Sequence, residues 1–205
     1  MVAIIDYRMG NLASVRNALA KIGADSAVVS DPHEVKKYER VLLPGVGAFG
    51  DAMVHLRERG MDEAVKEFAS SGKPMLGICL GMQLLFSKSL EFGIHEGLAL
   101  IPGEVVPFDP NLFDTPHKIP HMGWNELFVQ RDTPILSDLP KEFYLYFVHS
   151  FHAVTTDEYA IGRTWYGYEF VSAVQNGNIF GIQPHPEKSH NNGLKILKNF
   201  VEFQG

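Results

Sequence analysis

The chain of 205 residues has a formal charge of -6, 45% hydrophobic residues and one cysteine, which is the composition of an ordinary globular protein. No apolar run approaches the roughly 20 residues that span a bilayer, and no basic stripe offsets the negative charge, so we expect neither a membrane nor a nucleic-acid partner. A single cysteine excludes an internal disulfide, and the first residues contain no basic segment that leads into an apolar one. We therefore expect a cytoplasmic protein.

Strands and amphipathic helices alternate through the first half of the sequence. Leu12, Val15, Leu19 and Ile22 recur at helical spacing and are followed by Gly23. The same reasoning predicts strands over 2–5, 27–29, 40–43 and the apolar residues before Cys79, and helices over 12–22, 32–39 and 52–69, the last broken at Gly60. Such alternation is typical of βαβ units, so a parallel sheet with helices on both faces is expected.

From Gly103 onward the sequence consists of shorter pieces rich in strand-forming residues. These pieces cover about 103–108, 125–129, 143–154, 170–174 and 179–182, and the turn sequence QNGN at 175–178 predicts a hairpin between the last two. Leu194, Leu197, Phe200 and Val201 share one side of a final helix. We therefore predict a single α/β domain over 1–205, an open and mostly parallel sheet flanked by helices with an additional antiparallel β layer.

Cys79 lies in the stretch GICLG, which starts at Gly77 and has the form G-x-C-x-G. This form is the thiol counterpart of the nucleophile elbow, a cramped strand-to-helix turn that presents a reactive side chain. The apolar run before Cys79, and the spacing of Met82, Leu85 and Phe86 after it, predict the strand and the helix that the motif requires. On this pattern alone Cys79 is either a nucleophile or a small buried hydrophobic residue.

A thiol nucleophile needs a base, and the segment QPHPEKS offers one at His185. Two prolines flank this histidine and favour an extended chain, in which His185 and Glu187 project to the same side. The carboxylate can then orient the imidazole, as the third member of a triad does. The segment follows a predicted strand and so lies at a strand end, but a solvated surface turn remains the alternative.

The loop PGVGAFG contains the pattern G-x-G-x-x-G from Gly45 to Gly50. A dinucleotide-binding loop would carry its acidic residue at the end of a second strand, whereas Asp62 and Glu63 lie in helical sequence. The glycines can instead expose backbone N–H groups that stabilise an oxyanion. A plain glycine turn is the third alternative.

Two histidine pairs, His117 with His121 and His149 with His152, raise the question of a metal site. Neither pair has the carboxylate or cysteine companions of a convincing ligand set, so we expect structural histidines and no metal. Of these residues, His149 is the one that we expect near a pocket.

Three stretches, PGVGAFG from Pro44, GICLGMQLLF from Gly77 and QPHPEKS from Gln183, occur together as in the class I, or triad-type, glutamine amidotransferases, which this chain resembles. Within that class, PGVG in place of paired glycines, KIPHMGWN from Lys118 and YFVHSF from Tyr146 are similar to the glutaminase subunits of imidazole glycerol phosphate synthase. The resemblance extends over essentially the whole chain. It implies a flavodoxin-like fold, hydrolysis of L-glutamine and no cofactor.

The resemblance also implies roles for individual residues. Cys79 would attack the glutamine carboxamide, His185 would transfer the proton, and Glu187 would hold His185. The implied oxyanion hole is formed by backbone N–H groups of Leu80 and of the loop Gly45, Val46 and Gly47, and the implied glutamine site by Gly47, Gln83, Glu91, Ser150 and Phe151. Pro184 and Phe151 depart from the residues most frequent in the class, which affects the expected shape of the pocket.

The implied partner is a separate (β/α)₈-barrel cyclase, which forms a heterodimer with the glutaminase and uses its ammonia in histidine biosynthesis. Met122 and Trp124 are candidates for the docking face, with core positions as the alternative, and Asn11 is a further candidate. We also expect the loop 45–47 to be misaligned in the isolated chain and to reorient when the partner binds. A stand-alone cysteine hydrolase, a binding subunit with an incidental thiol, and a paralogue that serves a sugar-modifying barrel remain alternatives.

Overall fold

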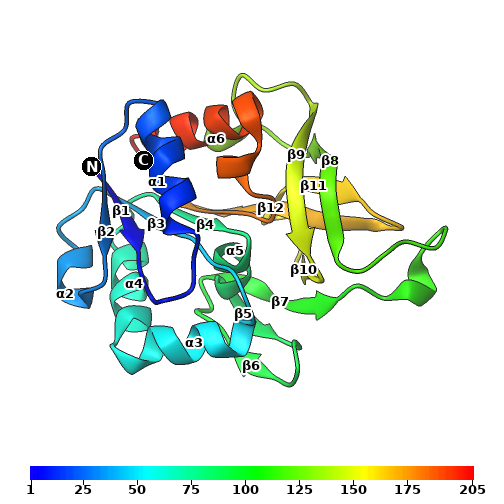
Figure 1. The fold of residues 1–205 in the computed structure, drawn as a ribbon, viewed down its shortest axis with the longest axis horizontal. Coiled ribbons are helices and arrows are strands. Elements are labelled where there is room, and N and C mark those ends of the chain that lie inside the picture. Colours follow the sequence, from blue (N-terminus) through cyan, green and yellow to red (C-terminus); the bar gives the residue numbers. More distant parts are fainter.

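The computed structural model describes residues 1–205, and a parallel sheet forms its centre (Figure 1). Four of the sheet's five strands are buried along most of their length, as expected for runs of apolar residues without alternation, whereas the edge strand over 26–29 is more exposed. The strand order is β2-β1-β3-β4-β13, and neighbouring strands run parallel. These strands are β1 (Val2–Ile5), β2 (Ser26–Val29), β3 (Arg40–Leu43), β4 (Met75–Ile78) and β13 (Ile179–Ile182).

Helices cover both faces of the parallel sheet, which confirms the predicted arrangement (Figure 1). Consecutive residues of a strand point to opposite faces: Ile4 packs in the core under α1 (Leu12–Lys21) and α6 (His190–Glu202), whereas Ile5 packs in the core under α3 (Phe49–Glu58) and α4 (Met61–Ser70). The helices are α1 (Leu12–Lys21), α2 (Pro32–Val35), α3 (Phe49–Glu58), α4 (Met61–Ser70), α5 (Leu80–Leu84) and α6 (His190–Glu202). None of them combines the length and the apolar character that a membrane crossing requires.

The antiparallel strands of the second half continue the same sheet of 13 strands. The predicted hairpin is present, because β12 (Glu169–Asn176) pairs antiparallel with β13 across Gly177 and Asn178. The piece expected over 143–154 is two strands, interrupted at Ser150. The remaining strands are β5 (Phe86–Ser89), β6 (His95–Glu96), β7 (Ile101–Pro107), β8 (His121–Val129), β9 (Glu142–His149), β10 (Phe151–Val154), β11 (Ala160–Trp165) and β12 (Glu169–Asn176).

Two predicted helices are shorter than expected. The helix predicted over 32–39 ends at Val35, because the following residues must turn the chain into β3 at Arg40. The helix after Cys79 ends at Leu84, and Phe86 begins β5, where pairing with β7 replaces the helical hydrogen bonds. The predicted break at Gly60 is confirmed, with φ at 71° between α3 and α4.

Glycines allow the turn around Cys79 to pack against β3. A Cβ atom at Gly81 would overlap the carbonyl oxygen of Leu43, and one at Gly77 would lie 2.6 Å from the carbonyl oxygen of Gly81. Neither neighbour is a flexible side chain, so the backbone itself would have to shift. The glycines of the motif are therefore required by close backbone approach.

Replacing Gly81 with alanine is expected to lower the free energy of unfolding by at least about 3 kcal/mol, because the methyl group meets the backbone of β3. Gly72→Ala is the control, since φ is 76° there but nothing lies within 4 Å of the added Cβ; its expected cost is about 1 kcal/mol for left-handed backbone. Urea unfolding followed by circular dichroism measures both values. Equal losses in the two variants would contradict the packing argument.

Candidate active site

Cys79 occupies the turn between β4 and α5, with φ at 54° and ψ at -113°. A residue other than glycine at such angles is strained by about 1–3 kcal/mol, and such strain collects at functional sites. The side chain is nearly buried, with 7% of the residue exposed. The strand, the sharp turn and the short helix are the context predicted for a nucleophile elbow.

The sheet brings His185 next to this turn. Strand β13 lies beside β4 in parallel register, with Ile182 opposite Ile78, so both chains leave the sheet at the same edge. The Nδ1 atom of His185 lies 2.8 Å from Oε1 of Glu187, and the two side chains are 3% and 1% exposed. The predicted pairing of these side chains is present in the structure.

The backbone at this pair differs from the expected extended segment. His185 is extended, with φ at -98° and ψ at 94°, but Pro186–Lys188 forms a 3₁₀ turn. The turn is favoured because a proline at its first position needs no N–H partner there. The carboxylate therefore reaches back to the ring from a turn, not along a strand.

The protonation of His185 depends on both of its neighbours. Burial alone would lower the pKa of this histidine, but hydrogen bonds to Cys79 and Glu187 and the negative charge of both groups outweigh burial and raise the pKa to about 10. His185 therefore holds a proton at neutral pH. Because Cys79 contacts His185 and His185 contacts Glu187, a proton can move between the sulfur and the imidazole while the carboxylate stabilises the charged ring.

A cavity of about 530 Å³ opens onto Cys79 and His185, within the size range of small-molecule sites. Most of the predicted site residues line it: Val46, Gly47, Cys79, Leu80, Gln83, Glu91, Ser150, Phe151 and His185. Gly45 does not line the cavity, because it packs on the other side of the loop, against Tyr7, Leu80 and Gly81. Glu187 lies behind His185 and lines a narrow crevice together with Asn11.

The glycine loop over 44–47 faces this cavity, and its opposite side packs against the loop that follows β1. The hydroxyl of Tyr7 donates a hydrogen bond to the carbonyl oxygen of Pro44 at 2.8 Å, and Tyr7 is only 4% exposed. Burial, and secondarily the charge of nearby Cys79, raises the pKa of Tyr7, so the hydroxyl keeps its proton. The terminal methyl carbon of Met9 lies 2.6 Å from the position that a Cβ atom at Gly47 would take, so the same segment packs against the loop.

Replacing Tyr7 with phenylalanine is expected to lower the free energy of unfolding by about 1–2 kcal/mol, because the buried carbonyl of Pro44 loses its donor. The loss of support under the loop is expected to lower glutamine turnover by about 3- to 30-fold. Tyr38→Phe is the matched control, since Tyr38 is partly buried in the same core. Turnover and urea unfolding check both effects, and equal values for the two variants would contradict this role of Tyr7.

Two other side chains at the cavity are fixed by hydrogen bonds. The amide nitrogen of Gln83 donates to the carbonyl oxygen of Phe151 at 3.1 Å and to Oε1 of Gln183 at 3.0 Å. Oε2 of Glu91 accepts a hydrogen bond of 2.6 Å from the backbone N–H of Phe49. Burial raises the pKa of Glu91, although this hydrogen bond works in the opposite direction.

Met122 and Trp124, the candidates for the docking face, lie on the surface. The alternative that they are core residues is therefore wrong. Met122 is 61% exposed and Trp124 is 47% exposed. The ring of Trp124 stacks on His190 with centroids 5.0 Å apart. The side chain of Asn11 caps α1 by accepting from the backbone N–H of Ser14.

Sequence reasoning missed three residues at the site and did not predict the contact between two of the histidines. Tyr7 and Gln183 contact site elements that are distant in sequence, and Phe92 lines the cavity from an exposed loop. The structure pairs His121 with His149, not with its sequence neighbour, because these residues are opposite each other on β8 and β9. Of these residues, only Gln183 could have been predicted as a site residue from the sequence, because it directly follows a predicted strand.

Comparison with known proteins identifies the family. The glutamine amidotransferase class-I family model matches residues 3–203. The imidazole glycerol phosphate synthase subunit HisH of Sulfurimonas denitrificans is 63% identical over 205 residues, covering 100% of this chain and 99% of that protein. The subunit HisH of Wolinella succinogenes is 58% identical and covers 99% and 100% of the two chains.

Among solved structures, that of PurLQS from Thermotoga maritima matches with a TM-score of 0.77 and 22% identity, covering 100% of this chain and 98% of that chain. At this identity the match supports the fold alone, and it agrees with the predicted fold class. The sequence relatives go further, because their identity is high and extends over the full length. The chain belongs to the class I glutamine amidotransferases, and within them to the HisH subunits of imidazole glycerol phosphate synthase.

Proposed function

We propose that this chain hydrolyses L-glutamine to glutamate and ammonia and passes the ammonia to a cyclase subunit for imidazole glycerol phosphate synthesis in the histidine pathway. The observation that carries the proposal is a buried thiol on a strained turn, in contact with a histidine that a buried carboxylate holds. The identity of 63% with a HisH subunit supports this acceptor over a sugar-modifying paralogue. The alternative of a stand-alone hydrolase gains no comparable support.

In the proposed reaction Cys79 is the nucleophile. With the thiol proton already on His185, the thiolate sulfur attacks the carboxamide carbon of glutamine, and protonated His185 gives that proton to the departing ammonia. Water then hydrolyses the glutamyl thioester and restores the thiol, so that glutamine and water become glutamate and ammonia. Glu187 orients His185 through the 2.8 Å contact and stabilises its positive charge.

Backbone N–H groups of Leu80 and of the loop 45–47 are the proposed donors to the oxyanion. Leu80, Val46 and Gly47 line the cavity beside Cys79, whereas Gly45 contributes by leaving room for the packing of the loop. One donor of this kind contributes a factor of about 10² to 10³ in rate. Reorientation of this loop upon partner binding remains our proposal, because glycine changes its peptide orientation at little steric cost.

The proposed glutamine site uses the polar groups of the same cavity. The carboxylate of Glu91 suits the positively charged amino group of the substrate, and Gln83 with the backbone of Ser150 and Phe151 fixes the rest. Gly47 leaves room for the approach of the substrate to the loop. All these residues line the cavity around Cys79.

The proposed cyclase partner docks on the face that carries Met122 and Trp124. Exposed methionine and tryptophan are favoured interface anchors, and both project from β8 as residues more than 45% exposed. Asn11 lines the same narrow crevice as His185 and Glu187. A partner that contacts Asn11 therefore acts next to the triad.

A glutamine analogue with an electrophilic ketone carbon in place of the carboxamide tests the site assignment. We expect mass spectrometry to find one label per chain, on the peptide that contains Cys79, and we expect glutamine to protect against labelling. The analogue shortened by one methylene is the control and should label slowly. Labelling elsewhere, or labelling that glutamine leaves unchanged, would exclude Cys79 as the group that meets the carboxamide.

A further inference from the structure

A chain of hydrogen bonds crosses the antiparallel region toward the cavity. His121 on β8 and His149 on β9 are opposite each other, and Nδ1 of His121 lies 3.0 Å from Nε2 of His149. Nδ1 of His149 in turn lies 2.8 Å from the carbonyl oxygen of Phe151. At the other end, the amide nitrogen of Asn125 lies 3.1 Å from Nε2 of His121. Both imidazoles are buried, with 2% and 6% of each residue exposed.

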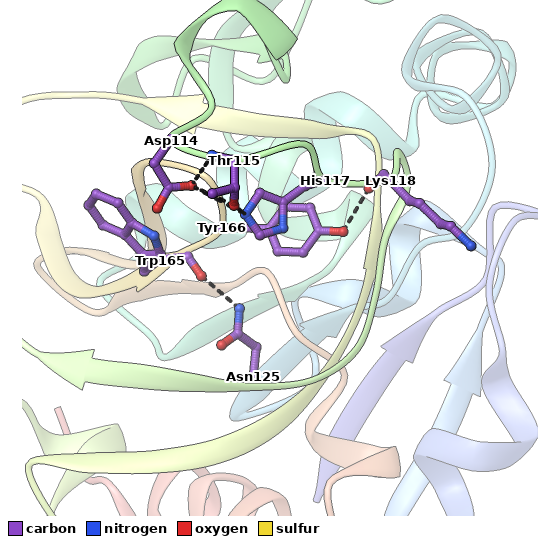
Figure 2. Close-up of polar contacts among 7 residues, drawn as sticks. All are labelled: Asp114, Thr115, His117, Lys118, Asn125, Trp165 and Tyr166. Carbon is purple, nitrogen blue, oxygen red and sulfur yellow. Dashed lines mark hydrogen bonds and ion pairs between the residues drawn. The ribbon is translucent and has the colours of Figure 1, made fainter.

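The direction of every hydrogen bond in this chain is fixed. Asn125 cannot flip its amide, because its oxygen accepts from the backbone N–H of Glu126 at 2.8 Å and its nitrogen donates to the carbonyl of Trp165 at 2.8 Å (Figure 2). The same nitrogen therefore donates to His121. The carbonyl of Phe151 can only accept, so the proton of His149 is on Nδ1.

The two imidazoles are then neutral, with the same tautomer. Each holds its proton on Nδ1 and uses the bare Nε2 as an acceptor. Burial lowers the pKa of His121 to about 4 and that of His149 well below its usual value, which agrees with the neutral form. The ring of His121 is clamped between Tyr166 and Phe147, with centroid distances of 4.0 and 4.7 Å.

The chain ends at the side chain of Gln83. The carbonyl of Phe151 accepts from both His149 and Gln83, which occupies both of its lone pairs. The second amide hydrogen of Gln83 goes to Gln183, whose own amide nitrogen lies 3.8 Å from the sulfur of Cys79. Both hydrogens of the Gln83 amide are therefore used, and its carbonyl oxygen is the group left to face the cavity.

We propose that His121, with Asn125, positions the glutamine pocket: the histidine chain fixes the carbonyl of Phe151 and so keeps the oxygen of Gln83 available to accept an N–H of the substrate. His121 does not line the cavity, so it acts only through His149 and Phe151. This inference rests on the proposed function of the cavity as a glutamine site. It assigns a role in substrate affinity to a residue of β8 that touches no substrate.

His121→Phe tests the proposal, because phenylalanine keeps the ring between Tyr166 and Phe147 but removes the donor to His149. In the complex with the barrel cyclase, KM for glutamine is expected to rise by about 3- to 10-fold, the value of one hydrogen bond, with kcat changed by less than about 3-fold. His152→Phe is the matched control, since His152 is a buried histidine of the same aromatic cluster whose ring bonds go to Ala153 and Tyr168. Its KM should stay at the wild-type value.

Nitrogen-15 chemical shifts of the histidine rings in the wild-type chain provide a test that does not depend on the folding of a variant. Both His121 and His149 should be neutral at pH 7 with the proton on Nδ1. The opposite tautomer in either ring, or equal KM values for His121→Phe and His152→Phe, would overturn the positioning role. Failure of the wild-type complex to hydrolyse glutamine would overturn the proposed function instead, while the ring tautomers would still report on the chain.

Discussion

Replacing Cys79 with alanine is expected to abolish glutamine hydrolysis, with kcat lowered by at least about 10⁴-fold. The thioester cannot form without the sulfur, and no other side chain projects from the strained turn at residue 79. The free energy of unfolding should change by only about 1 kcal/mol, because alanine retains the backbone conformation and loses one small group. Glutamate release in the complex with the cyclase measures the first effect and urea unfolding the second.

Binding of glutamine distinguishes a lost nucleophile from a lost pocket. Cys79→Ala should still bind glutamine in isothermal titration calorimetry, because the proposed recognition groups on Gln83 and Glu91 are unchanged. Cys79→Ser is the matched variant that keeps the size of the side chain and weakens the nucleophile. Glutamate release by Cys79→Ala at a rate near that of the wild type would exclude the thiol as the reacting group.

The second large effect is expected from Glu187→Gln, which should lower kcat by about 10² to 10⁴-fold. The amide keeps the shape of the carboxylate but removes the charge that stabilises a protonated His185. The free energy of unfolding should also fall, by about 1–3 kcal/mol at neutral pH, because protonated His185 loses the buried carboxylate that compensates its charge. Both kcat and the free energy of unfolding are therefore expected to decrease.

The pH dependence of stability gives a further readout of the same change. The pKa of His185 is raised from 6.5 to about 10 in the folded chain. Between these values the folded chain retains a proton that the unfolded chain releases, so this contribution to stability is complete below pH 6.5 and is lost as the pH rises toward 10. Glu187→Gln should flatten this decline, whereas Glu202→Gln, an exposed carboxylate on α6, should leave both the decline and kcat unchanged. Loss of activity in Glu202→Gln equal to that in Glu187→Gln would contradict the account.

Short sequence patterns were sufficient to predict the central strands of the sheet and to select Cys79, His185 and Glu187 as triad candidates. The central strands are apolar along their whole length because they are buried on both faces. The glycines around Cys79 reflect backbone contacts within a few residues of it and with β3, and the pair His185 and Glu187 is only two residues apart. Each of these features can be predicted from a few neighbouring residues in the sequence.

Features that depend on long-range register could not be predicted in this way. Tyr7 meets Pro44 only because β1 and β3 are neighbours in the sheet. His121 meets His149 only through the register of β8 and β9, since a shift by one residue would send the two rings to opposite faces. Phe86 satisfies a helical pattern equally well, and pairing of β5 with β7 decides its conformation.

The most direct test of the account is glutamate release from glutamine by the wild-type chain, first alone, then with the barrel cyclase, and then with the cyclase and its nucleotide ligand. We expect slow release by the chain alone and strong stimulation by the liganded cyclase, with Cys79→Ala as the blank. Such a result identifies a gated ammonia donor and its acceptor. Turnover that is equally fast with and without the cyclase would contradict the account and indicate an autonomous hydrolase or a different partner.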